Sequence, residues 1–337
     1  MGSVLPLQFE GQRQTSQKWL VKSGRNGVIL LTGELIVQQV LNGVTLGVMY
    51  SLIAVGFTLF FGVIDVVNFA HGEVFMLGAF SALLASGVLI SAGFVPGSWS
   101  LLGLLLFLVL LSGAVLGGLM ERFIVKPMRS APEIMTLLIT LGASIVMRES
   151  VMLFFPNGRN PQPFPPLIGM QSIPIGGVLI KPDVILTVVL AAGLISGLYF
   201  VIEKTAFGRY IRATAQDREA AMMMGIKVNR VFLITFALGS ALGAVAGLMN
   251  GLTYGIIKFN MGFAVGIKGF AAAVVGGLGN VYGAVAGGLL LGLMETLVVA
   301  VVPDGSSFQD SISFVIVILF LVFRPAGIFG ERAYEKV

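Results

Sequence analysis

Long uninterrupted apolar stretches recur along the chain, separated by short polar or proline-rich segments. Each stretch has about 20 residues, enough for a helix to cross a hydrocarbon core about 30 Å thick. Strands of a transmembrane barrel would alternate polar and apolar residues, so the continuous pattern favours helices. We expect spans over residues 36–61, 73–92, 99–120, 134–155, 183–202, 231–252, 262–279, 281–302 and 310–323.

The seventh stretch, 262–279, is glycine-rich, and we expect either a full crossing or a re-entrant or broken helix there, so the count of spans is eight or nine. The predicted fold class is an all-α polytopic membrane bundle with broken or re-entrant segments. We divide the chain into an N-terminal extension over 1–35, a transmembrane domain over 36–330 and a C-terminal tail over 331–337.

Composition supports a membrane location, because 56% of the residues are hydrophobic and only 11% are charged. Many of the 45 glycines lie inside the apolar stretches, where small residues let helix backbones approach closely. Two glycine-bearing halves, around residues 42–78 and 243–292, indicate an inverted repeat of weak internal similarity.

Basic residues cluster after the third, fifth and last spans, which places those segments in the cytoplasm. Nine crossings then put the start of the first span outside, in conflict with the basic residues of the extension. The net charge of +5 is explained by these loops, and we do not expect nucleic acid as a partner. With no cysteine and one histidine, we also expect no disulfide and no tetrahedral metal site.

The loop over residues 156–182 is rich in proline and lies outside in this topology. Proline fixes backbone torsions and blocks helix continuation, so we expect a semi-rigid irregular cap. The cap is either a docking surface or a spacer.

The one long charged stretch, residues 203–230, separates the fifth and sixth spans and must lie at a water interface. Asp217 begins a short helix there, and Gly225 is able to end it in the left-handed conformation. Ala220 and Ala221 predict a small, flat contact face. Physics alone leaves two interpretations open, a surface on which another protein pushes and an ordinary solvated loop helix.

The sequence Glu219-Ala220-Ala221 with Gly225 resembles the "EAA…G" coupling element of ABC importer permeases. Further matches at 42–52, 61–73, 268–279 and 324–330 resemble the permeases of branched-chain amino acid, or Liv-type, transporters, most closely their "H" component. The resemblance extends from about residue 36 to the end of the chain. Residues 1–30 have no counterpart in the family pattern, and the coupling element lacks the Leu-Pro found downstream in some importers.

This resemblance implies a non-catalytic permease subunit of an ATP-driven importer in the bacterial inner membrane, moving branched-chain or other neutral amino acids. It implies a second permease subunit in a heterodimer, two cytoplasmic ABC ATPase subunits that bind ATP and Mg, and an extracytoplasmic solute-binding protein. No cofactor is expected on this chain. The implied coupling residues are Arg209, Arg212, Asp217, Arg218, Glu219, Ala220, Ala221 and Gly225.

Polar residues within or beside the spans are the candidates for the translocation pathway, because ionisable groups at membrane depth are costly unless paired or hydrated. Asn68 is a candidate helix cap, and the free N–H groups of such a helix start attract carboxylates. Alternatively, His71 and Glu73 tie two helices together through buried hydrogen bonds. The full set is Asn42, Tyr50, Asn68, His71, Glu73 and Glu295.

Two other functions stay open. Relatives of this kind also move urea, amides and other small solutes, and an ATPase-independent secondary transporter or channel would need coupling carboxylates at midplane, of which Glu295 is one. The glycine-rich 266–288 stretch lacks the Gly-Lys-Ser/Thr ending of a phosphate-binding loop, so ATP is expected on a partner. An intramembrane enzyme is disfavoured because His71 has no serine partner.

Overall fold

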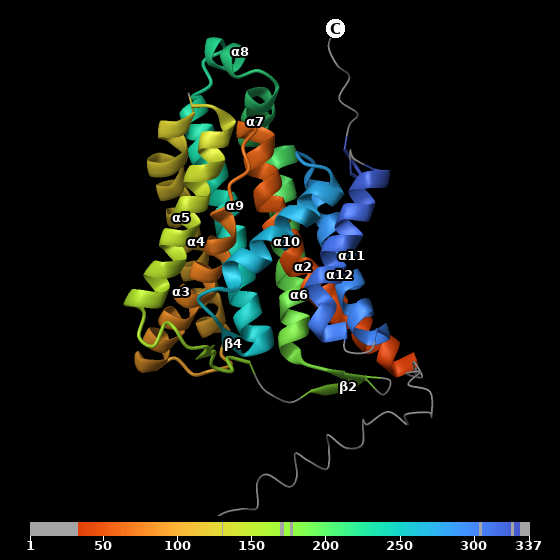
Figure 1. The fold of residues 1–337 in the computed structure, drawn as a ribbon. Helices are drawn as coiled ribbons and strands as arrows, with labels where there is room; N and C mark the ends of the chain where they lie inside the picture. Colours follow the sequence, from red (N-terminus) through yellow and green to blue (C-terminus); the bar gives the residue numbers. More distant parts are fainter. Residues whose placement is uncertain are drawn as a thin grey trace, which may run out of the picture.

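The computed structural model describes residues 33–129, 131–168, 172–175, 178–302, 305–324 and 327–330. These residues form a helical bundle, and every apolar stretch predicted to span the membrane is helical. Seven helices are long and apolar enough to cross a membrane, and two shorter apolar helices accompany them. The seven are α2 (Gly33–Ile64), α3 (His71–Ser91), α4 (Trp99–Met120), α5 (Glu133–Phe154), α6 (Pro182–Lys204), α9 (Val228–Tyr254) and α11 (Val281–Val301), and the two shorter ones are α10 (Met261–Gly276) and α12 (Gly305–Phe323) (Figure 1).

The all-α polytopic fold class is therefore confirmed. The predicted extension over 1–35 and the tail over 331–337 lie outside the described residues, except that residues 33–35 already belong to α2.

Helices α2 and α9 form the core of the bundle. The most apolar window of α2 is 89% buried and that of α9 is 78% buried, against 17% for α5 and 22% for α6. The two central helices pack on each other and on most of the surrounding ones. The outer helices present apolar side chains to their surroundings, as expected where lipid is the solvent.

Small residues make the closest contacts between helices. Gly43 and Gly47 of α2 face Gly288 and Gly292 of α11, and a methyl group placed on Gly292 would lie 2.3 Å from the backbone nitrogen of Gly47. The Ser51 hydroxyl, one turn along α2, donates across the contact to the Val285 carbonyl at 2.9 Å. Glycine is required here because the two backbones touch.

Two helices begin inside the bundle. After α2 ends, Asp65 adopts a positive φ of 57° and the chain turns back before α3 begins at His71. His71 lies beside Gly56, about 12 Å along the axis of α2 from its end. Helix α10 begins against the same place, since Gly72 would meet Gly262 and Gly266 if it carried a methyl group.

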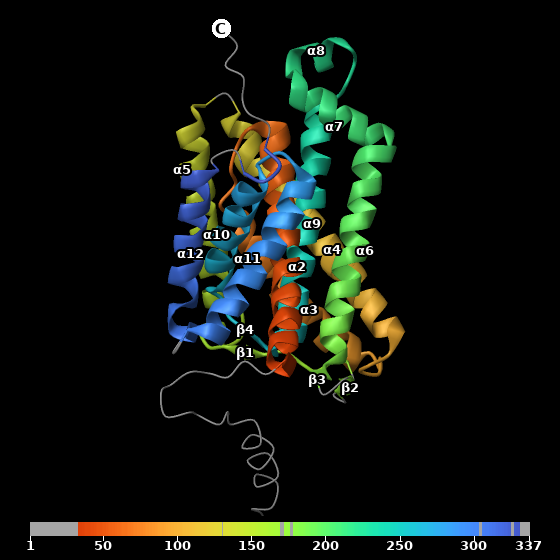
Figure 2. The same ribbon diagram turned by 90° about the vertical axis from the view of Figure 1, so that its right-hand side faces the viewer.

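From this meeting point α3 runs toward one end of the bundle and α10 toward the other (Figures 1 and 2). The broken segments predicted from sequence are therefore present, and their opposite directions agree with the expected inverted repeat. The first backbone N–H groups of these two helices have no acceptor within the helix, and they are tolerated at this depth because protein surrounds them.

The two ends of the bundle differ in structure. One end carries α7 (Ala206–Gln216), α8 (Arg218–Met223) and the extension of α4 by a π-helical turn, η1 (Glu121–Val125), and a 3₁₀ turn, η2 (Lys126–Met128). The other end carries two short antiparallel pairs, β1 (Gln162–Pro163) with β4 (Ile256–Ile257) and β2 (Ile173–Ile175) with β3 (Val178–Ile180). The sequence predicted an irregular cap there and none of these strands.

Basic side chains gather at the end with α7 and α8, which is therefore the cytoplasmic end. Helix α2 begins at the opposite, outer end (Figure 2), as nine crossings require. The basic residues at the cytoplasmic end include Arg122, Lys126, Arg129, Lys204, Arg209, Arg212, Arg218, Lys227, Arg230 and Arg324.

The glycine contact between α2 and α11 predicts an asymmetric response to alanine. Gly292→Ala is expected to destabilise the protein by about 1–3 kcal/mol, because the methyl group overlaps the backbone of Gly47. Gly142→Ala on α5 is the matched control, since nothing lies within 4 Å of the added methyl. Thermal unfolding in detergent measures both, and equal melting temperatures for the two variants would contradict this packing.

Candidate functional sites

Helix α8 is a short rod with both ends capped. The Asp217 carboxylate accepts from the N–H groups of Glu219 at 2.9 Å and Ala220 at 3.0 Å, which makes it the N-cap. At the other end Gly225 has a φ of 82°. The Gly225 N–H donates to Met222 and the Ile226 N–H to Ala221, the bond pattern of a Schellman motif. The predicted start and end of this helix are both present.

A small apolar cluster seats α7 and α8 on the cytoplasmic ends of the bundle helices. Ile211 of α7 and Ala221 of α8 are buried in it, together with Phe60, Phe232 and Phe236. The prediction of a contact face made of Ala220 and Ala221 is wrong for Ala221, which is only 4% exposed because it faces the bundle. Ala220 and Glu219 are exposed.

The exposed surface of α8 and the turn after it is largely methionine. Met222 is 55% exposed, Met223 87% and Met224 83%. Unbranched, polarizable methionine side chains adapt to irregular partner surfaces. Three such side chains on a water-facing tip are costly in isolation and indicate a surface made for contact.

An ion pair joins the rod to the bundle, and a second one lies beside it at the end of α4. Arg218 lies 3.0 Å from the carboxylate of Asp65, the residue that follows α2 and precedes the turn toward α3. Arg129 lies over the Phe232 ring at 4.2 Å and pairs with Glu121. Partial burial lowers the pKa of Arg129, and the Glu121 carboxylate opposes that shift.

The remaining predicted coupling residues lie on α7. Arg212 donates to the Ile202 carbonyl at 2.6 Å and lies 3.6 Å from Glu203, so it fastens α7 to the end of α6. Arg209 is exposed. The structure thus groups the eight predicted residues on two consecutive short helices and the residues that cap the second one, at the cytoplasmic end.

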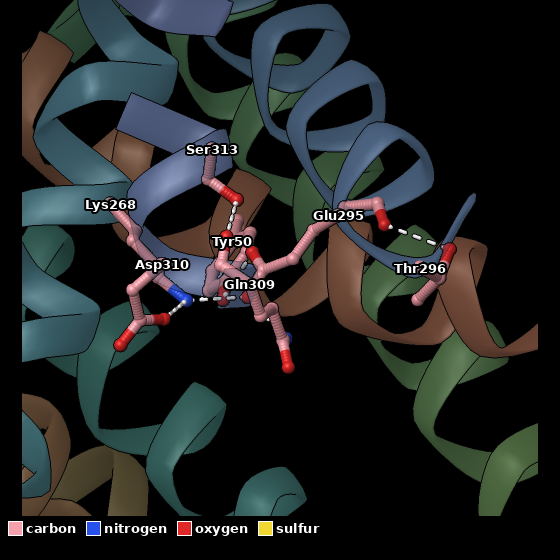
Figure 3. A network of polar contacts seen from close by, with 8 residues as sticks. Tyr50, Lys268, Glu295, Thr296, Gln309, Asp310 and Ser313 are labelled. Atoms are coloured by element: carbon pink, nitrogen blue, oxygen red, sulfur yellow. Dashed lines mark hydrogen bonds and ion pairs between the residues drawn. The ribbon is translucent and has the colours of Figure 1, made fainter. Parts of the chain in front are cut away.

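A buried polar network joins four helices (Figure 3). Glu295 of α11 is 1% exposed, and its carboxylate lies 2.5 Å from the Lys268 ammonium of α10. It also accepts from the Tyr50 hydroxyl of α2 at 3.0 Å and from the Gln309 amide of α12. Lys268 in turn lies 2.6 Å from Asp310. Two predicted pathway residues, Tyr50 and Glu295, are therefore in direct contact.

Asn68, His71 and Glu73 line the start of α3 but do not face one another. The Asn68 side chain accepts from the Ala70 N–H at 3.1 Å, and Ala70 is the N-cap, so the prediction that Asn68 caps the helix is wrong by two residues. Glu73 accepts from Ser144 of α5 at 3.1 Å, which confirms a hydrogen bond between helices.

His71 forms no such bond within the described residues. Its ring lies edge-on to Phe57 and Phe60 at 4.9 Å each, against the glycine face of α9. One oxygen of Glu73 likewise has no described partner and lies beside Gly262, at the start of α10. His71 and Glu73 thus point to different neighbours.

Asn42, the last predicted pathway residue, lies apart from the others. It accepts from Gln38 at 3.3 Å and lines a cavity of about 410 Å³ between the outer ends of α2, α6, α9, α11 and α12. Within the part of the chain that the structure describes, no three histidine, aspartate or glutamate side chains gather in a metal-binding group.

Sequence reasoning missed several residues that complete these sites. A lysine inside an apolar stretch is a signal in itself, and Lys268 is the partner that Glu295 required. The exposed run Met222–Met224 was visible in the sequence but is usually read as core. Asp65 and Asp310 gave no local signal, because their partners are distant along the chain.

Comparison with known proteins places the chain among transport proteins. A family model described as "Branched-chain amino acid transport system / permease component" matches residues 39–322. The chain is 36% identical over 302 residues to the high-affinity branched-chain amino acid transport system permease protein BraD of Pseudomonas aeruginosa, covering 89% of this chain and 97% of that one. It is 35% identical over 305 residues to LivH of Escherichia coli, with the same coverage. No solved structure gives a significant match.

The buried network yields a prediction for stability. Lys268→Met leaves the Glu295 carboxylate buried without its cation, and we expect a loss of about 3–5 kcal/mol. The double variant Lys268→Met/Glu295→Gln removes both charges and is expected to regain most of that loss. Thermal unfolding of both variants provides the measurement; a double variant no more stable than Lys268→Met would show that the pair is not the stabilising contact.

Proposed function

Because this chain belongs to the permease-component family of branched-chain amino acid transport systems and is a multi-pass permease subunit of an importer in the inner membrane, we propose that it moves branched-chain amino acids under ATPase control. The observation that carries the proposal is α8, a doubly capped rod that presents methionines and acidic groups at the cytoplasmic end.

We define the coupling hairpin as residues 206–225, which hold α7, α8 and the glycine that ends α8. The proposed assembly contains two cytoplasmic ABC ATPase subunits. One of them binds the coupling hairpin of this chain, and the other binds a second permease subunit. Exposed methionines supply apolar contact area, and the exposed Glu219 supplies a charge beside them, next to the small Ala220. ATP and Mg bind on those partners, and this chain does no chemistry.

A second permease subunit forms a heterodimer with this chain in the proposed assembly. Asp310 supports a covering partner on this face, because its side chain, although paired with Lys268, is 67% exposed on α12 among exposed apolar residues such as Phe308 and Val315. A carboxylate facing lipid is costly, so protein or water must cover this surface. An extracytoplasmic solute-binding protein delivers the solute to the outer end, membrane lipid covers the remaining apolar surface, and nucleic acid has no place in the assembly.

The hairpin transmits movement through Asp65 and Arg218. This ion pair joins α8 to the residue at which the chain turns back toward the start of α3. A displacement of α8 therefore acts on the segment 65–70, which leads into the bundle beside His71. The predicted coupling residues and the predicted pathway residues are connected by this short route.

Reversing the charge of Glu219 tests the docking surface. Glu219→Lys and Met223→Asp are expected to lower ATP-driven leucine uptake at least tenfold, because each places an unfavourable charge in the proposed interface. Lys126→Glu is the control, an exposed reversal on the same cytoplasmic face outside the coupling hairpin. Uptake is measured in vesicles holding the complete transporter. Full uptake by Glu219→Lys, or uptake that needs no ATPase, would instead support a secondary transporter or channel.

A charge swap tests transmission. Arg218→Asp should slow uptake several-fold, and the double variant Asp65→Arg/Arg218→Asp should recover much of it, because the swap restores the pair with reversed polarity. Stability should hardly change, since exposed ion pairs contribute only about 0.2–1 kcal/mol. Paired uptake and melting-temperature measurements separate the two effects; equal uptake by the single and double variants would refute the route through Asp65.

A further inference from the structure

Two neighbouring cavities lie at the outer end of the bundle. The cavity that Asn42 lines has a volume of about 410 Å³, and a second one of about 370 Å³ lies beneath the proline-rich loop. Both volumes lie in the range of about 300–1,000 Å³ that is usual for small-molecule sites. Lys181, Thr253 and Tyr254 line both cavities and so mark their junction.

Both cavities have walls that combine polar and apolar groups. The first combines amide and hydroxyl groups, including Gln38, Asn42, Thr296 and Gln309, with aliphatic side chains such as Leu41, Leu46 and Val299. The second has a mostly apolar wall, which Phe164, Pro165, Leu167 and Leu252 provide. Polar and apolar surfaces side by side suit a small amphipathic molecule.

Charges of both signs stand at the junction. Lys181 is the N-cap residue of α6, and Asp183 lies in the first turn of the same helix. Asp183 lines the second cavity, next to the shared Lys181. Neither forms an ion pair with another described residue. A zwitterion needs one cation and one anion close together, and these two side chains supply them.

The first cavity is also connected to the moving parts of the bundle. Gln309 lines it and donates its amide to Glu295, which holds Lys268 of the broken helix α10. Its other walls come from the core helices α2 and α9 and from α6 and α11. A molecule in this place therefore touches elements that reach both the centre and the cytoplasmic end.

We propose that this junction is a transit site for a zwitterionic amino acid with an apolar side chain. Lys181 binds the carboxylate and Asp183 the ammonium group, while the side chain lies against Phe164, Leu167 and Leu252. Amides and hydroxyls of the first cavity receive the polar head group as it moves inward. The inference rests on the proposed function and deepens it, because urea or a simple amide has no side chain for the apolar wall.

Photo-labelling and substitution test the site in proteoliposomes that hold the complete transporter, supplied with binding protein loaded with the diazirine analogue of leucine. We expect label on peptides covering residues 164–168, 181–184 or 252–255. Lys181→Gln and Asp183→Asn should each lower leucine uptake at saturating loaded binding protein at least tenfold, with ATP hydrolysis changed less than twofold. Lys258→Gln is the matched control, an exposed lysine at the same end that lines neither cavity.

The outcomes separate the site from the function. Leucine uptake by the unsubstituted transporter with label only elsewhere on the chain, or normal uptake by Lys181→Gln, would overturn the site and leave the proposed function standing. Failure of the unsubstituted transporter to accumulate leucine while it accumulates another solute would overturn the proposed substrate, and the assignment of this junction to an amino acid with it.

Discussion

The close approach of helix backbones through small residues is the contact on which this structure depends. Lipid tails are as apolar as leucine, so apolar burial alone does not drive helices together in a membrane. Gly47 meeting Gly292 and Gly72 meeting Gly266 instead let main chains touch, which brings dispersion contacts and weak polar contacts within range. The same contacts let α3 and α10 begin at depth, because surrounding backbone and side chains replace the lipid that a broken helix does not tolerate.

Polar contacts are stronger inside the bundle than at the cytoplasmic surface, which suits a rigid core and a movable coupling hairpin. Around Glu295 the ions are buried and joined by several hydrogen bonds, so removing one partner is costly and α10, α11 and α12 stay connected. The coupling hairpin is held by a small apolar cluster and by the solvent-exposed pair of Arg218 and Asp65. Exposed pairs of this kind are weak, so the hairpin is able to shift on the bundle without breaking the core.

Much of the fold was predictable because, in lipid, each long apolar stretch forms one helix. The ends of α8 were predictable because Asp217 and Gly225 are local signals for a helix start and a helix end. Properties that depend on tertiary contacts were not predictable from the sequence. Ala221 is buried because it packs in the same apolar cluster as Phe232 and Ile211, and no local sequence pattern reveals this contact. The predicted cap at Asn68 was wrong by two residues, because the turn before a buried helix start can adopt several geometries. Pairing of β1 with β4 joins residues almost a hundred positions apart, beyond what alternation in two-residue strands reveals.

The core helices connect the outer cavities to the coupling hairpin as stiff rods. Helix α2 lines the outer cavity at Asn42, touches His71 at Gly56 and ends beside Asp65, about 33 Å along the helix from Asn42. Helix α9 connects the same places. It runs from Phe232, in the apolar cluster under the coupling hairpin, past His71 at Gly243 to Tyr254 at the cavities. Close-packed helices of this kind move as bodies and do not deform continuously. The bends available to them are the residues with positive φ at their ends, Asp65 and Gly255, and each leads directly into a segment that starts a broken helix. A push on the hairpin is therefore transmitted by α2 and α9 to the place where α3 and α10 meet.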